Sequence, residues 1–131
     1  METWPNDVRI VFKHNALPFH KRAMPAAIAS MAAHKQGKFW EYHDKLYENQ
    51  QALSKDDLIR YAKEIGLNMS RFQDALQSRK WKAFVDKDSQ EGQRAGISGT
   101  PSVFINGLKY AGPRGYPPAG LDGVARLYMG L

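Results

Sequence analysis

The segment Gly99-Thr100-Pro101-Ser102-Val103-Phe104-Ile105-Asn106-Gly107 decides how this chain is interpreted. A proline near its start leads into a short apolar run. The Asn106-Gly107 dipeptide at its end is a strong signal for a two-residue β-hairpin turn. The pattern predicts a strand from Ser102 to Asn106 and a returning strand from Leu108 to Ala111.

Upstream of this hairpin, the sequence predicts one further strand followed by several helices. Val8 to His14 is rich in β-branched residues and predicts the strand. The residues after it have mainly helical spacing. The expected helices run from about Pro25 to Gly37, from Lys38 to Gln50, from Ser54 to Gly66, from Asn68 to about Leu76, from about Trp81 to Ala95, and from about Pro118 to Met129.

Two short patterns mark the starts of helices in this region. Ser54 with Asp57 three residues later resembles a capping box, and Asn68 is a suitable N-cap residue. His43 lies on an aromatic face of its expected helix, so we interpret it as a packed, hydrogen-bonded side chain.

The composition predicts one folded domain that does not bind nucleic acid. The chain has 131 residues, 43% of them hydrophobic, and a formal charge of +6. Basic residues alternate with acidic ones between residues 34 and 94, which is typical of a solvated surface. No apolar run is long enough to insert into a membrane, and the first residues lack the features of a signal peptide. The compartment is left undetermined.

The residue types also limit the chemistry. The chain has no cysteine, which excludes disulfides, thiolate metal sites and thiol nucleophiles. His14 and His20 flank one loop, but no carboxylate is close in sequence and no helical His pair is present. We therefore expect no metal site, no cofactor and no catalytic residue within this chain.

Four stretches resemble the DsbA-like branch of the thioredoxin superfamily, bacterial disulfide oxidoreductases with a helical domain inserted into the core. Val8 to His20 resembles a core strand and its exit loop, and Met24 to Ala27 resembles the start of the insertion. Gln36 to Asp44 is similar to a helix-opening signature, and Gly96 to Gly107 is similar to the proline loop and hairpin. The resemblance implies an α/β thioredoxin-like fold in one partial domain, residues 1–131, with a helical insertion at about 23–95.

The chain also departs from this family. Its members begin with a central strand and a helix carrying Cys-x-x-Cys, and the chain resembles a truncated member that lacks both. Disulfide exchange requires a thiolate, for which serine and threonine cannot substitute. The resemblance therefore implies a thiol-disulfide oxidoreductase homologue or fragment that is inactive as given. It also suggests a periplasmic or other extracytoplasmic location for a full-length parent.

The resemblance further implies a binding site and a partner. It implies a cis bond before Pro101, and it places an extended substrate peptide against Thr100 and Pro101. Without the central strand, its two neighbours would expose unpaired backbone groups. We expect a homo-oligomer formed by strand exchange or edge pairing, or a partner chain that supplies the strand. Two alternatives remain open: a non-enzymatic peptide-binding or assembly module, and a relative of the kappa-class glutathione-transferase-like isomerases.

Overall fold

The computed structural model describes residues 5–110, which fall into two compact units. Lys13–Ser98 forms the first unit, and residues 5–12 and 99–110 belong to the second. The first unit is helical, and the second contains a two-stranded hairpin. The described part of the chain is therefore mostly helical, with one small sheet.

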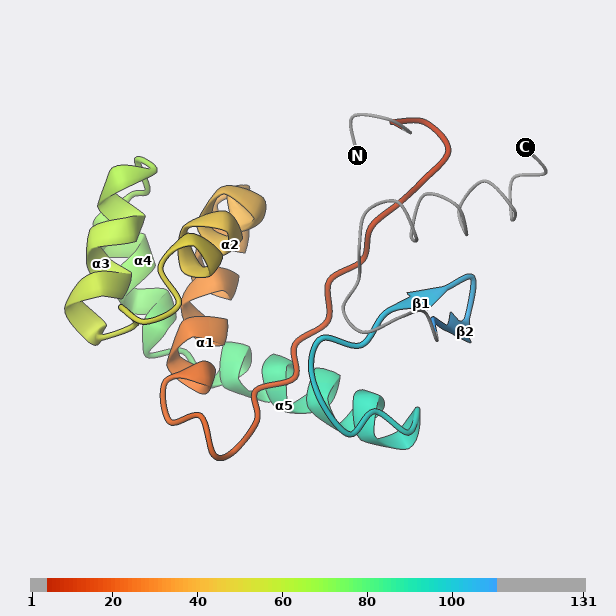
Figure 1. The fold of residues 1–131 in the computed structure, drawn as a ribbon. Helices are drawn as coiled ribbons and strands as arrows, with labels where there is room; N and C mark the ends of the chain where they lie inside the picture. Colours follow the sequence, from red (N-terminus) through yellow and green to blue (C-terminus); the bar gives the residue numbers. More distant parts are fainter. Residues whose placement is uncertain (1–4, 111–131) are drawn as a thin grey trace. The chain divides into compact units, whose positions relative to one another are not determined.

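Helix α1 is the centre of the helical unit (Figure 1). It contacts all four other helices of the unit, and alanines make up much of its buried surface. Because these small side chains lie on several sides of α1, neighbouring helices can approach it on more than one face. Helix α1 therefore has no single apolar face. The five helices are α1 (Ala23–His34), α2 (Phe39–Glu48), α3 (Lys55–Glu64), α4 (Met69–Leu76) and α5 (Arg79–Arg94).

The predicted helix starts at α3 and α4 are confirmed. Ser54 Oγ accepts a hydrogen bond from the Asp57 backbone N–H at 3.2 Å, and the Asp57 carboxylate accepts one from the Ser54 N–H at 3.0 Å. Asn68 Oδ1 accepts from the Arg71 N–H at 3.0 Å. These side chains satisfy backbone N–H groups that have no partner inside the helix. The starts of α3 and α4 are therefore determined by residues within three positions of each other.

The core of the helical unit contains aromatic residues whose polar atoms are satisfied. Tyr42 is fully buried, and its hydroxyl donates to the Leu58 carbonyl oxygen at 2.9 Å. The ring of Tyr42 lies 5.7 Å from that of Phe72, which is also fully buried. The Tyr61 hydroxyl donates to the Ala52 carbonyl oxygen at 2.7 Å. Burial of these large rings together with the alanines of α1 holds α1 to α4 together.

The predicted strand from Val8 to His14 is wrong for the structure described. These residues have no regular secondary structure, and Ile10 and Val11 are 54% and 63% exposed. A β-strand requires a neighbouring backbone for its hydrogen bonds. Within residues 5–110, the sheet consists of β1 and β2 alone, so this segment has no strand beside it.

The predicted hairpin is confirmed, although its strands are short. Strand β1 (Phe104–Ile105) pairs antiparallel with β2 (Leu108–Lys109), with Phe104 opposite Lys109. Asn106 and Gly107 both have positive φ, 48° and 82°, as this two-residue turn requires. The helix expected from Pro118 to Met129 lies outside the described residues.

Candidate functional site

The loop that precedes the hairpin contains the two residues expected to bind a substrate. The Thr100-Pro101 peptide bond is cis, in agreement with the expectation from the resemblance. Both residues are exposed. The Ser102 hydroxyl donates to the Gly99 carbonyl oxygen at 2.8 Å, which closes the loop around the proline. The loop therefore presents Thr100 and Pro101 to solvent, and their role in binding stays a prediction.

The backbone beyond this loop is fixed by the hairpin. The Tyr110 N–H donates to the Val103 carbonyl oxygen at 2.8 Å, which extends the pairing beyond β1 and β2. Exposed apolar side chains lie on the hairpin, with Phe104 at 38% and Leu108 at 62% exposure. In its own unit, this arrangement combines two exposed residues with an adjacent hairpin that carries exposed apolar side chains. Such a surface can accept an extended peptide by main-chain hydrogen bonding.

The helical unit contains a group of aromatic and imidazole rings in contact, which we call the Phe39 cluster. The Phe39 ring lies 6.2 Å from that of His14, 6.3 Å from His34 and 5.9 Å from His43. His43 also stacks on Tyr47 at 4.5 Å, and its Nδ1 lies 3.0 Å from the Asp44 carboxylate. The interpretation of His43 as a packed, hydrogen-bonded side chain is confirmed. The members of the cluster are His14, His34, Phe39, Trp40, His43 and Tyr47.

No pattern in the sequence indicates this cluster, because its members come from separate segments. His14 precedes α1, His34 ends α1, and His43 lies within α2. No spacing rule relates positions on three different segments. The ring of His20, the other histidine to which the sequence drew attention, lies 4.6 Å from that of Phe19. Across residues 5–110, no three His, Asp or Glu side chains are arranged to hold a metal ion.

Residues 13 and 14 are attached to α5 by Asp88. The buried Asp88 carboxylate accepts a hydrogen bond from the His14 backbone N–H at 3.0 Å and lies 3.5 Å from Lys13 Nζ. Lys13 Nζ also donates to the Glu91 carboxylate, and this hydrogen bond lowers the pKa of Glu91. These contacts hold the segment that brings His14 to the Phe39 cluster.

The buried position of His14 affects its protonation. Burial lowers the pKa of the His14 imidazole, His43 lowers it further, and the Asp88 carboxylate opposes both effects. The charged form of a buried imidazole is disfavoured because it loses its hydration. His14 is therefore a neutral side chain at pH 7 and is sensitive to acid.

Lowering the pH should decrease the free energy of unfolding, because His14 is buried in the folded protein. Below about pH 6.5 the unfolded chain takes up a proton on His14, whereas the folded chain does so only at lower pH. The free energy of unfolding should therefore fall with decreasing pH in this window, with a contribution of at most about 1.4 kcal/mol per pH unit. Urea denaturation between pH 7 and pH 5 measures this slope. The slope should decrease in His14→Gln and persist in His20→Gln, which alters an exposed histidine. A His14 pKa at or above 6.5 by NMR would contradict the prediction.

Comparison with known proteins places these features in a family. Over 107 residues, the chain is 39% identical to the Na(+)/H(+) antiporter NhaA 3 of Salinispora tropica, a match that covers 81% of this chain and 16% of that protein. It is 37% identical to the Na(+)/H(+) antiporter NhaA of Herminiimonas arsenicoxydans, covering 82% of this chain and 17% of that protein. The chain thus spans only 16–17% of the length of these two relatives. In the part of the chain that the structure describes, no helix is long and apolar enough to cross a membrane.

A known family matches most of the sequence. No solved structure matches the chain. The sequence pattern of the family described as thioredoxin matches residues 5–118, which include the cis-proline loop and all the helices described above. The chain therefore belongs to the thioredoxin family, in its DsbA-like branch, and it contains no cysteine.

Proposed function

We propose that this chain is the substrate-facing part of a DsbA-like thiol-disulfide oxidoreductase and is inactive in disulfide exchange by itself. The observation that carries the proposal is the exposed Thr100-Pro101 loop in a chain that belongs to the family. Disulfide exchange proceeds by attack of a thiolate on a disulfide sulfur. Since the chain has no cysteine, the thiolate has to come from another segment or another polypeptide.

We further propose that the same segment supplies a β-strand which lies beside Ile10 and Val11. Ile10 and Val11 are β-branched and more than half exposed, and they lie in a stretch whose sequence favours a strand. Their exposure is costly in water, since each such side chain gains roughly 1.5–3 kcal/mol on full burial. A strand added beside them would cover these two side chains. A second copy of the chain, paired at this edge, is the competing occupant.

The proposal is tested by adding the strand and the two cysteines that this chain does not contain. A segment with one β-strand followed by a Cys-x-x-Cys helix is fused before residue 5, and glutathione-dependent reduction of insulin is measured. The unmodified chain should show no reduction above background. The fused protein should reduce insulin, and replacement of its first cysteine by serine should abolish the activity. Thr100→Pro in the fused protein should raise KM, because proline removes the backbone N–H available to a substrate peptide.

The outcomes of this test separate the possible roles. A fused protein that is folded and monomeric but does not react with insulin would refute the oxidoreductase role. A compact, stable dimer of the unmodified chain in sedimentation experiments would favour pairing between copies over a strand from another segment.

A second candidate function is a non-enzymatic peptide-binding module. It is favoured by the exposure of Thr100, Pro101 and Phe104, none of which needs a thiol to contact a peptide. In this case the unmodified chain binds an extended peptide, and a titration by fluorescence anisotropy detects it. Thr100→Pro should weaken the complex. Binding by the unmodified chain without activity in the fused protein would select this function.

The names of the relatives suggest a partner protein for either function. Both relatives described above are sodium/proton antiporters several times longer than the matched region. We propose that the domain is an accessory to a membrane antiporter of this kind. Co-purification of this chain with the Salinispora tropica antiporter lacking its matched region tests the proposal. Failure to co-purify at micromolar concentration would count against it.

A further inference from the structure

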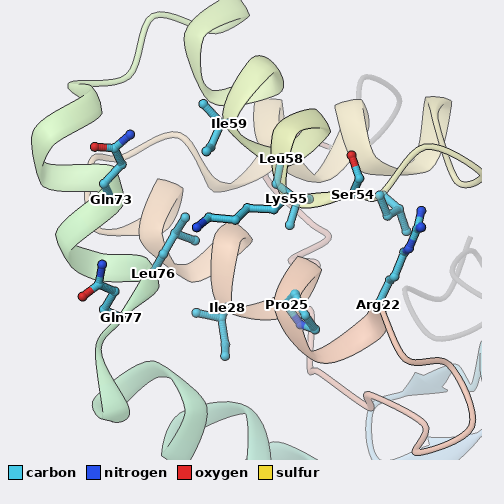
Figure 2. Close-up of a pocket in the computed structure, with 11 residues that line it drawn as sticks. Arg22, Pro25, Ile28, Ser54, Lys55, Leu58, Ile59, Gln73, Leu76 and Gln77 are labelled. Atoms are coloured by element: carbon cyan, nitrogen blue, oxygen red, sulfur yellow. The ribbon is translucent and has the colours of Figure 1, made fainter.

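The helical unit contains a cavity whose lining residues do not include Thr100 or Pro101. It has a volume of about 850 Å³ and lies among the start of α1, the start of α3 and the end of α4 (Figure 2). This volume falls in the range of small-molecule sites in proteins. All the lining residues lie within Lys13–Ser98, so the cavity is complete within one compact unit.

The cavity has an apolar floor and a polar rim. Leu58 is buried, and Ile28, Leu53, Ile59 and Leu76 are half-buried around it. The polar lining residues are mostly exposed: Arg22 just before α1, Lys55 on α3, Gln73 on α4 and Gln77 just after α4. An apolar interior with a few convergent polar groups is typical of a ligand site.

The charged residues of the rim are all positive. Arg22 and Lys55 are the charged lining residues, and the lining contains no carboxylate. Within residues 5–110, neither cation forms an ion pair. Figure 2 shows the Lys55 side chain extending across the cavity toward Leu76. The Ser54 hydroxyl is already engaged with Asp57, so the cations and the amides of Gln73 and Gln77 remain to contact a polar group.

We propose that this cavity binds an aliphatic carboxylate, with the hydrocarbon tail on the Leu58 floor and the carboxylate beside Lys55 and Arg22. The tail gains free energy by leaving water, at roughly 0.8 kcal/mol for each buried methylene group. The carboxylate stays near the exposed rim and keeps part of its hydration, while the two cations attract it. A cationic amphiphile with the same tail would be repelled by the same residues.

The test uses decanoate as the probe and the full chain as the protein. Calorimetric titration below the critical micelle concentration should give saturable binding, and the backbone amide NMR signals of Ile28, Leu58 and Leu76 should shift. Lys55→Glu should weaken the binding about tenfold, since it replaces an attraction by a repulsion. Lys63→Glu is the matched control: it makes the same charge change on an exposed position of α3 outside the cavity, and it should leave the affinity within about twofold.

Several results would overturn the proposal. Absence of saturable binding, equal affinity for decyltrimethylammonium, or an unchanged affinity in Lys55→Glu would each exclude a carboxylate site here. Circular dichroism of each variant verifies that the helices are intact. The outcome is independent of disulfide exchange, because the titration involves neither Thr100 nor a thiol.

Discussion

Replacement of Phe72 by alanine should lower the free energy of unfolding of the helical unit by about 3–5 kcal/mol. Phe72 is fully buried and packs against the fully buried Tyr42 ring. Truncation removes the transfer free energy of the ring and leaves a cavity that the surrounding helices fill only in part. Small domains are stable by only about 5–15 kcal/mol, so the loss should be visible as a large decrease in the urea midpoint.

Phe84→Ala is the matched control for this prediction. Phe84 is the same residue type on α5, but its exposure is 41%. The substitution should cost much less, because 41% of Phe84 is already exposed to solvent and its truncation leaves no closed cavity. Equal losses in the two variants would mean that the core is not organised around Tyr42 and Phe72. Urea denaturation followed by circular dichroism at 222 nm, at pH 7, measures both variants.

Asp88→Ala should reduce the free energy of unfolding by roughly 1.5–3 kcal/mol. The substitution removes a buried carboxylate that accepts the hydrogen bond of the His14 N–H and pairs with Lys13. A hydrogen bond to a charged group is worth more than a neutral one, and a buried donor that loses its acceptor pays a desolvation penalty. Since Lys13 is itself largely exposed, the hydrogen bond should account for most of the effect.

Asp86→Ala provides a control two residues earlier on the same helix. Asp86 pairs with Lys82 at 2.7 Å on the surface of α5. A surface pair of this kind contributes little, so the loss should stay near or below about 0.5 kcal/mol. Hydrogen exchange of the His14 amide distinguishes the two variants. Protection of that amide should fall in Asp88→Ala only, and a retained protection would show that Asp88 does not hold this segment.

The sequence was sufficient for features that depend on neighbouring residues. The Ser54 capping box, the Asn68 cap and the Asn106-Gly107 turn each involve residues at most three positions apart, and the structure confirms all three. Helices α3, α4 and α5 were predicted because their apolar residues recur with the amphipathic period of 3.6. The cis bond at Pro101 followed from the resemblance, since most X-Pro bonds are trans.

The features that sequence analysis missed depend on contacts between distant segments. The strand expected at Val8 to His14 was wrong because strand propensity does not provide a partner backbone. The Phe39 cluster and the Asp88 carboxylate join residues from separate helices, and no local pattern brings His14 to α5. The apolar cavity could not be predicted from the sequence either, since its floor and rim come from three helices and a loop.

By itself, the sequence of this protein determined where α3 and α4 begin, the hairpin and the absence of a thiol, because these are set by residue type and short-range spacing. Tertiary structure decided which histidines meet, which carboxylate is buried and where a cavity remains. Those properties arise when α1, with its small alanine side chains, allows other helices to pack around it and brings residues from separate segments together.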